Sequence, residues 1–229
     1  MMLKLNNELF NLIKRYGECK TFKPHAIIHL NNEENFLYAF EKGITFLKHT
    51  DITGKVLLSK ICKKGSIYIE TVEEFSQFQI NYHLFFKEDT TLYQVSINKL
   101  KEKIDNDNLN TLVLKYTHNE IRKRELTLRD YTFYGKKGTI LSNLVRLANS
   151  FGKTLKNGTI LIDIKLTHED LSQLCGMSRE RTTKTISKLK SDNILDYDKK
   201  IKKFIILDLG SIKNQINCEE CPLNFCNIC

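Results

Sequence analysis

One long stretch of the chain, from Asn108 to about Tyr134, contains neither glycine nor proline and is rich in Leu, Arg, Glu and Lys. These residue types favour helix, and nothing in the stretch interrupts one. We therefore expect a single long helix that lies between two globular parts. At 229 residues the chain is long enough for two domains that each bury a core.

An imperfect apolar stripe follows the predicted helix. Its members are Leu109, Leu112, Tyr116, Ile121, Leu128 and Phe133. A helix surrounded by water would leave this stripe exposed, so we expect a partner helix from a second copy of the chain to cover it. The alternative is that the stripe packs onto the helix's own domain. The sequence thus favours a homodimer.

Short apolar or alternating runs, separated by turns, precede the helix. They span 26–30, 36–40, 44–47, 56–61, 66–69, 77–83 and 91–95. Gly43, Gly54 and Gly65 lie between runs, where a hairpin needs a permissive backbone. Many short strands at this spacing predict a sandwich or barrel, and a short helix is expected from Ser96 to Asp105.

Two short helices are predicted in the C-terminal part. Thr167 and Asp170 form a capping-box pattern at the start of the first helix. The Cys-Gly-Met sequence at 175–177 supplies a tight break, and Ser178 can cap a second helix over 179–191. Two short helices around a turn that contains glycine are typical of a helix-turn-helix.

The start of the second helix carries the side chains that we expect to read DNA. Arg179 can donate two hydrogen bonds to guanine, Glu180 can accept one from cytosine, and Lys184 can reach guanine or phosphate. Phosphates position a protein on DNA without specifying sequence. We expect them to be bound by Thr182, Thr183 and Lys188.

Strands at 194–197 and 204–207 predict a β-hairpin after the second helix, and so a winged helix. The residues between them include Lys199, Lys200, Lys202 and Lys203. The net charge is +9, and residues 135–217 hold sixteen Lys and Arg against eight Asp and Glu. Such a footprint is typical of a protein that binds a polyanion, here double-stranded DNA. A solvated basic face without a partner is the alternative.

Several classes of protein do not match the sequence. The N-terminus has no signal-peptide core, and no apolar run approaches the roughly 20 residues that span a bilayer. We therefore expect a cytoplasmic protein with no membrane partner. No catalytic constellation is apparent, so we do not expect an enzyme. Cysteines are reduced in the cytoplasm, where a cluster of them indicates a metal before disulfides.

Four of the seven cysteines lie in the C-terminal tail, at Cys218, Cys221, Cys226 and Cys229. Compact cysteine runs of this kind wrap iron-sulfur cubanes, whose ligands are thiolates. Zinc is the alternative, because four thiolates also satisfy a tetrahedral ion. Structural zinc pairs are usually separated by a longer loop than the one between Cys221 and Cys226, which favours the cluster.

The order of these parts, with Arg179-Glu180-x3-Lys184 at the start of the second helix, resembles the CRP/FNR superfamily of bacterial transcription factors. The resemblance implies an α+β fold with an N-terminal β-roll of the cyclic-nucleotide-binding kind, a long dimerisation helix and a C-terminal winged helix-turn-helix. The corresponding parts here are residues 1–105, 106–134 and 135–212, followed by a cysteine-rich metal-binding tail at 213–229.

The resemblance also implies partners. RNA polymerase is one, and a TGTGA-like half-site with its inverted partner is the expected DNA target, although Lys184 stands where the family pattern has Arg. Cyclic AMP is not expected, because the segment from Gly65 to Tyr82, where that ligand's phosphate would bind, has no Gly-Glu pair and no Arg-Ser or Arg-Thr.

The tail resembles one branch of the FNR regulators of anaerobic respiration, whose C-terminal cysteines follow the pattern Cys-x2-Cys-x4-Cys. Cys218, Cys221 and Cys226 match it. That branch uses an aspartate, five residues before a Gly-Lys-Lys-Gly, as the fourth ligand of a [4Fe-4S] cluster. Asp130 stands five residues before the Gly-Lys-Lys-Gly at 135–138. Cys229, which the branch does not require, is the alternative fourth ligand.

The resemblance therefore implies an oxygen-responsive regulator of anaerobic metabolism that binds DNA as a dimer while its cluster is intact. The alternative is a zinc-stabilised regulator of the CRP/FNR type whose β-domain senses a small molecule.

Overall fold

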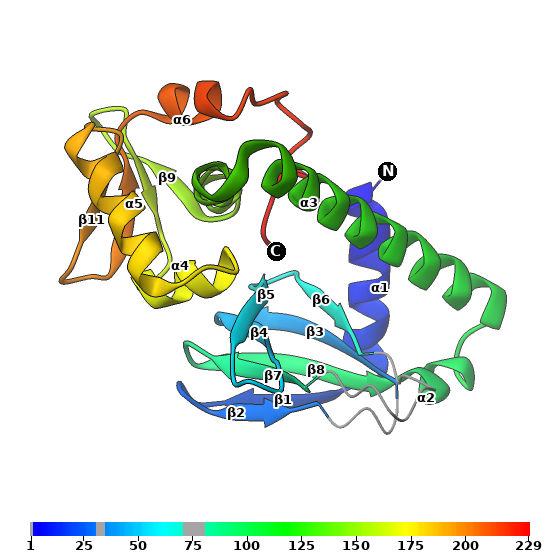
Figure 1. Ribbon diagram of the computed structural model, residues 1–229. Coiled ribbons are helices and arrows are strands. Elements are labelled where there is room, and N and C mark those ends of the chain that lie inside the picture. The colour runs from blue at the N-terminus through cyan, green and yellow to red at the C-terminus, as the bar shows by residue number, and fades with distance from the viewer. Residues whose placement is uncertain (1, 31–34, 71–80) are drawn as a thin grey trace. The chain divides into compact units, whose positions relative to one another are not determined.

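The structure, a computed structural model, describes residues 2–30, 35–70 and 81–229 (Figure 1). The chain forms two compact units, Met1–Glu120 with Cys229 and Ile121–Ile228. The long helix α3 (Asn106–Phe151) begins in the first unit and continues into the second. Within the described residues, no helix combines the length and the apolar character needed to cross a membrane.

The first unit is built mainly from antiparallel strands. In chain order its elements before α3 are α1 (Met2–Tyr16), β1 (Glu18–Phe22), β2 (Ile27–His29), β3 (Phe36–Lys42), β4 (Thr45–Thr50), β5 (Val56–Cys62), β6 (Ile67–Ile69), β7 (Asn81–Phe86), β8 (Thr90–Ser96) and α2 (Ile97–Lys101). One sheet has the order β1-β8-β3-β6 and the other has the order β2-β7-β4-β5. Figure 1 shows this unit from blue to the first turns of green.

Strand β3 has apolar residues on both faces, because each face covers a different core. Tyr38 and Phe40 pack with residues of both sheets, including Leu47 and Leu84 of the second sheet. Leu37 and Ala39 point to the opposite face, where a second cluster forms with α1, α2 and the start of α3. The period of two along a strand assigns alternate residues to the two cores. This explains why the run from Phe36 to Phe40 is almost continuously apolar.

The predicted strands of this unit agree with the structure to within a few residues. The three glycines that separate them, Gly43, Gly54 and Gly65, all have positive φ. Only Gly54 lies in a hairpin, between β4 and β5, whereas Gly43 and Gly65 lie in connections between the two sheets. Strand β1 and helix α1 were missed. The predicted strand at 77–83 is described only from Asn81, and most of the segment from Gly65 to Tyr82 that was compared with cAMP binders, residues 71–80, lies outside the described residues.

The first part of the apolar stripe on α3 packs inside the first unit. Leu109, Leu112 and Tyr116 are at most 7% exposed and belong to the core beneath the β1-β8-β3-β6 sheet. Their predicted role as contacts to a partner helix is therefore corrected, because they cover the apolar face of their own sheet. Ile121 and Leu128 differ from them, since they are 49% and 66% exposed.

Helix α3 is interrupted once, at Gly135. This residue has φ 57° and ψ −161°, a conformation that only glycine adopts readily. A long helix ends here and a second helical segment follows it, up to Phe151. Because the break falls at the first glycine after Asn108, the limits of the uninterrupted helix could be predicted from the sequence.

The second unit continues from α3 into a small sheet and two short helices. Its further elements are β9 (Gly152–Thr154), β10 (Ile160–Ile162), α4 (His168–Leu174), α5 (Arg179–Ser191), β11 (Leu195–Asp198), β12 (Lys203–Ile206) and α6 (Leu209–Gln215). The sheet order is β11-β12-β10-β9, all antiparallel. Sheets in the first unit, a long helix and a winged helix-turn-helix in the second confirm the predicted α+β fold class. Strand β9 and helix α6 were missed.

Candidate nucleic-acid interface and metal centre

Helix α4 begins with the capping box that the sequence predicted. The Thr167 hydroxyl accepts the backbone N–H of Asp170 at 3.0 Å, and Asp170 Oδ2 accepts the backbone N–H of Thr167 at 2.9 Å. Both donors would otherwise be unpaired at the start of a helix, so the reciprocal pair fixes where α4 begins.

The turn between α4 and α5 is closed by the backbone. Gly176 has φ 61°, and the N–H of Met177 donates to the carbonyl of Ser172 at 3.0 Å. The Ser178 hydroxyl then accepts the N–H of Arg181 as the N-cap of α5. The helix-turn-helix is thus formed at the residues where the sequence placed it.

The inner face of α5 holds Thr182, Ile186 and Leu189, all buried. Thr182 is 0% exposed, and its hydroxyl oxygen has no hydrogen-bond partner among the described residues. The prediction that Thr182 binds phosphate is therefore wrong, because its helical position, four residues before Ile186, turns it into the core.

The outer face of α5 presents the other predicted residues. Arg179, Glu180 and Lys184 are exposed, as is Arg181, which the sequence analysis missed although it lies in the same first turn. Lys188 is also exposed, and its ammonium lies 2.7 Å from Asp192. Arg179, Arg181 and Lys184 therefore give the N-terminal half of α5 three exposed cations on the side away from the core.

Thr183 lies at the edge of this outer face and is half-buried. Its hydroxyl is 3.2 Å from Nδ1 of His168, whose ring stacks on Phe204 and contacts Tyr197. Burial, with the charges of Arg179 and Lys199 adding to it, lowers the pKa of His168 below its usual 6.5. A neutral imidazole therefore joins α4, α5 and the wing.

The wing is the hairpin of β11 and β12. Asp198 Oδ1 accepts the backbone N–H groups of Lys200 and Ile201, which closes the turn. Lys203, the first residue of β12, lies on the wing as predicted, and its ammonium pairs with Asp163, the residue after β10. Lys199, Lys200 and Lys202 remain on the exposed tip.

Asp130 lies in the last turn and a half before the break in α3 and is buried. Its Oδ2 accepts hydrogen bonds from Ser142 at 2.7 Å and from Arg146 at 2.6 Å, both on the helical segment after Gly135. Its Oδ1 accepts longer contacts from Arg129, at 3.2 and 3.4 Å. One carboxylate therefore connects the two segments of α3.

The next residue, Tyr131, connects the same break to the helix-turn-helix. The Asn143 side-chain amide donates to the Tyr131 hydroxyl at 2.7 Å and lies 3.3 Å from the sulfur of Cys175. The Tyr131 hydroxyl in turn donates to the carbonyl of Leu174, the last residue of α4. Burial raises the pKa of the Cys175 thiol to about 12, so Cys175 is a neutral, unreactive thiol.

The C-terminal tail is fixed to the second segment of α3. The Asn149 side-chain amide donates to the carbonyl of Cys226 at 2.8 Å, and the Ser150 hydroxyl accepts the N–H of Ile228 at 3.0 Å. Arg129 adds an ion pair to Glu219, with Nη1 2.8 Å from Oε2. Arg129 therefore touches both Asp130 and the tail.

Cys218, Cys221 and Cys226 all lie in the part of the tail that belongs to the second unit. None of the seven cysteines, which all lie within the described ranges, forms a disulfide. Burial raises the pKa of the Cys226 thiol; the charge of Arg146 acts to lower it, and Cys218 and Cys221 act to raise it further. The charges of Cys218 and Cys221 therefore act on the thiol of Cys226.

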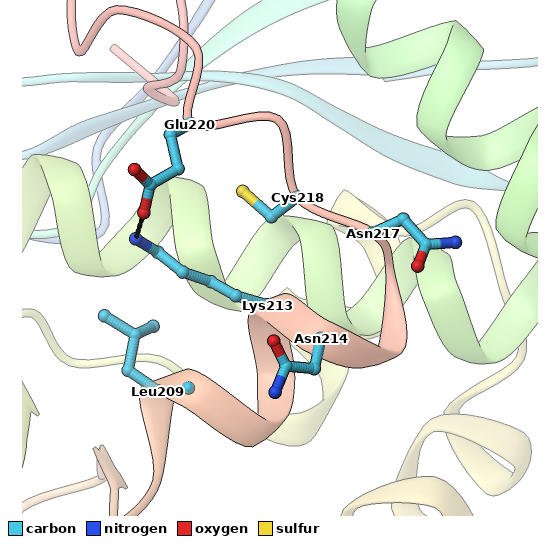
Figure 2. Close-up of a pocket in the computed structure, with 7 residues that line it drawn as sticks. Leu209, Lys213, Asn214, Asn217, Cys218 and Glu220 are labelled. Carbon is cyan, nitrogen blue, oxygen red and sulfur yellow. Dashed lines mark hydrogen bonds and ion pairs between the residues drawn. The ribbon is translucent and has the colours of Figure 1, made fainter.

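The Cys218 thiol lies at a surface pocket of about 680 Å³ beside α6. Figure 2 shows its sulfur near the ion pair of Lys213 and Glu220, whose charged atoms are 3.0 Å apart. The hydrogen bond to Glu220 and the charge of this carboxylate raise the pKa of Lys213. The Cys218 thiol is therefore accessible to solvent through this pocket.

Comparison with known proteins identifies the family. A Crp-like helix-turn-helix domain family matches residues 140–214. An anaerobic regulatory protein of Bacillus subtilis (strain 168) is 31% identical over an alignment that covers 98% of this chain and 94% of that protein. The chain belongs to the CRP/FNR family of transcription regulators.

Two solved structures share the fold. A mutant of CooA from Carboxydothermus hydrogenoformans has a TM-score of 0.71 at 18% identity, and the match covers 90% of each chain. A CRP/FNR family regulator from Thermus thermophilus has a TM-score of 0.66 at 19% identity, over 87% of this chain and 98% of that one. The family match and the 31% identical relative, not the shared fold, show that the chain is a transcription regulator and not an enzyme, as expected.

Whether this CRP/FNR regulator suits a [4Fe-4S] cluster can be judged from its donor atoms. Asp130 Oδ2 is fully engaged, whereas Oδ1 has only the long contacts from Arg129 and so retains lone pairs for a metal. Nε and Nη1 of Arg146 are buried and have no hydrogen-bond partner among the described residues. An anionic centre of thiolates would supply the acceptors that these donors lack.

A metal centre also requires that its ligand residues lie close together. Within the described ranges, no three residues among His, Cys, Asp and Glu are grouped to hold a metal ion. Asp130 and the tail are connected through Arg129, which bonds Asp130 and Glu219, and not by a shared ligand shell. Cys229 belongs to the first unit, whereas Cys218, Cys221 and Cys226 belong to the second. The donor chemistry fits the cluster, and the ligand set belongs to the proposal below.

Proposed function

We propose that this CRP/FNR regulator binds an inverted-repeat DNA site as a homodimer, and does so when a [4Fe-4S] cluster is held by Cys218, Cys221, Cys226 and Asp130. The observation that carries the proposal is the position of Asp130. Its carboxylate is fixed at the break in α3 and is joined to the tail through Arg129 and Glu219.

The DNA contacts are assigned to the exposed start of α5. Arg179 and Glu180 suit guanine and cytosine edges, and Lys184 suits guanine or phosphate. Arg181, Thr183, Lys188 and the wing lysines suit phosphates, which give affinity without sequence information. A TGTGA-like half-site is the expected target. Supporting this, the outer face of α5 is exposed and basic while its inner face is buried.

The dimer contact is assigned to the exposed apolar side chains of α3. Leu114, Ile121 and Leu128 are 70%, 49% and 66% exposed and recur every seven residues. A heptad repeat of this kind packs against a second helix in a left-handed coiled coil. Phe133, 70% exposed, lies close to the end of the same helix. Dimerisation would place two recognition helices roughly one DNA turn apart, about 34 Å.

The chain's own residues would transmit the state of the centre to the DNA-binding unit. Asp130 holds Ser142 and Arg146 across the break, while Tyr131 holds Asn143 and the end of α4. When bound, the cluster supplies an oxygen-labile link between Asp130 and the tail. Loss of that link frees the tail and loosens the angle at Gly135, on which the spacing of the two recognition helices depends.

Two further parts of the proposal concern partners. RNA polymerase is expected to contact the regulator once it is bound to DNA, and cAMP is not expected as a ligand. The sequence between Gly65 and Tyr82 supports the second point, because it lacks the Arg-Ser or Arg-Thr that a cyclic phosphate needs.

The test is anaerobic purification followed by analysis of iron and acid-labile sulfide. We expect a brown protein that bleaches in air and that binds an inverted-repeat site at least tenfold more tightly before bleaching, a difference of about 1.4 kcal/mol. Matched Ser substitutions of Cys218, Cys221 and Cys226 should each abolish the colour, whereas Cys175→Ser should not. A colourless protein with stoichiometric zinc would instead support the zinc-stabilised regulator, and equal binding before and after air would reject the oxygen switch.

A further inference from the structure

The guanidinium of Arg146 is only partly used by its ion pair with Asp130. The side chain is 3% exposed, and Nη2 donates to Asp130 Oδ2 at 2.6 Å. Nε and Nη1 are buried without a partner among the described residues. An unpaired buried donor costs about 1–3 kcal/mol, and more when it is charged. Such donors call for an acceptor that the protein chain does not provide.

Arg129 differs, although it touches the same aspartate. Its Nε and Nη2 approach Asp130 Oδ1, and its Nη1 donates to Glu219, so its three nitrogens all have partners. Its side chain is also more accessible, at 29% exposed. The unmet hydrogen-bonding capacity therefore belongs to Arg146 and not to both arginines that hold Asp130.

The surface of α3 on which Arg146 lies is the one that carries the tail. Asn149 and Ser150, three and four residues further along the helix, bind the backbone at Cys226 and Ile228. Residues at these spacings share one helix face. The positive charge of Arg146 also acts on the half-buried Cys226 thiol. Arg146 therefore lies between Asp130 on one side and the Cys226 turn on the other.

We infer that Arg146 is a positioning residue for the metal centre, which holds Asp130 through Nη2 and offers Nε and Nη1 to the sulfur ligand of Cys226. The inference rests on the proposed function. A centre ligated by three thiolates and a carboxylate is anionic, and a buried cation with N–H donors to sulfur offsets that charge. Net charge and hydrogen bonds to sulfur are what tune the reduction potential of such a centre.

The test compares full-length protein and its Arg146→Met, Arg146→Lys and Arg129→Met variants after anaerobic purification. Loss of a buried charge-assisted hydrogen bond is worth 1.4 kcal/mol or more, so Arg146→Met should lose its visible absorbance in air about tenfold faster than the parent. Its reduction potential should also become more negative, because removing a positive charge disfavours the reduced centre. Arg146→Lys, which keeps the charge and loses the planar fork, should fall between the two.

Arg129→Met is the matched control, because it also removes a contact to Asp130 but leaves the donors of Arg146 in place. Because Arg129 also links Asp130 to Glu219 of the tail, its loss should speed bleaching, but by less than the roughly tenfold increase expected for Arg146→Met. Equal rates and potentials in Arg146→Met and Arg129→Met would mean that Arg146 acts only by holding Asp130, which would overturn the inference.

The remaining outcomes separate the inference from the function on which it rests. If the parent protein binds no iron, the proposed function fails and the inference with it. If the parent binds iron and Arg146→Met matches its potential and bleaching rate, the inference alone fails. If Arg146→Met does not fold, as judged by circular dichroism, the comparison is made with Arg146→Lys, whose bleaching at the parent's rate would be the overturning result.

Discussion

Asp130 Oδ2 lies 2.6 Å from Nη2 of Arg146, across the break in α3 at Gly135. Both side chains are largely buried, at 10% and 3% exposed, and Ser142 donates to the same oxygen. The contact joins the end of the long helix to the helix that begins the DNA-binding unit. Because the two residues lie sixteen positions apart on either side of a non-helical residue, they meet only if the bend at Gly135 has its present angle.

Removing the carboxylate should destabilise the second unit. In Asp130→Ala the Arg146 guanidinium would stay buried without a counter-ion, which costs about 3 kcal/mol of unfolding free energy. Asp130→Asn keeps an acceptor oxygen and should cost less. Urea unfolding of metal-free protein, followed by circular dichroism, measures both. Equal stability of Asp130→Ala and the parent would contradict the central role given to this ion pair.

The backbone at Gly135 leads to a second prediction. With φ 57° and ψ −161°, the residue occupies a region that is nearly closed to residues with a Cβ atom. Gly135→Ala should therefore lower the unfolding free energy by about 1–3 kcal/mol, even though no heavy atom lies within 4 Å of the added carbon. Lys136→Ala, at the exposed next position, is the control and should change stability by less than about 0.5 kcal/mol.

Much of this architecture could be predicted from local signals. The capping box at Thr167, the turn at Gly176 and the hairpin glycine Gly54 act over a few residues, so the sequence reveals them directly. The end of the long helix is likewise a local signal, because it falls at a single glycine, Gly135.

The wrong predictions concern which face of a helix is buried, because this depends on tertiary packing and not on local sequence. Leu109 and Leu112 looked like a dimer stripe, yet they cover the sheet of their own unit, and Leu114 on the exposed side was missed. Thr182 looked like a phosphate ligand, yet it points inward. Arg146 gave no signal at all, because an arginine within a helical pattern does not reveal that it is buried beside an aspartate sixteen residues away.

Substitutions on opposite faces of α5 should separate DNA recognition from packing. Arg179→Met should weaken binding to the inverted-repeat site by at least tenfold, since a bidentate contact to guanine is worth about 1–3 kcal/mol. Lys190→Met is a suitable control, because its ammonium pairs with Asp196 at the other end of the helix, and affinity should change less than about threefold. Fluorescence anisotropy with labelled duplex at fixed salt measures both.

A substitution on the inner face of α5 should leave DNA binding unchanged. Thr182→Val replaces a buried hydroxyl that has no partner among the described residues by a methyl group of similar size. Stability should stay equal or rise by about 1 kcal/mol, and the dissociation constant for DNA should be unchanged. A clear loss of affinity in a variant that remains folded would return Thr182 to the DNA-facing surface.

Two half-buried histidines, His83 and His168, make stability depend on pH. Burial holds the pKa of His168 below 6.5, and burial with His29 and Lys48 does the same for His83. The unfolded chain therefore binds protons more readily near pH 6, and stability should fall as the pH drops from 7 towards 5. Replacing both histidines by Gln should flatten this slope in urea unfolding. An unchanged slope would assign the effect to other groups.

The apolar residues of α3 allow the dimer proposal to be tested apart from the fold. Leu128→Glu places a charge on a side chain that is 66% exposed in the single chain, so the monomer should fold normally. In a coiled coil the same charge would be buried against its copy, and the dimer should dissociate. Sedimentation velocity should therefore show a monomer, with circular dichroism like that of the parent.

Leu112→Ala is the matched control, since Leu112 is 3% exposed in the core of the first unit. This variant should lower the unfolding free energy by about 2–5 kcal/mol while the dimer persists. Persistence of the dimer in Leu128→Glu would place the contact between subunits elsewhere than on the stripe of Leu114, Ile121 and Leu128.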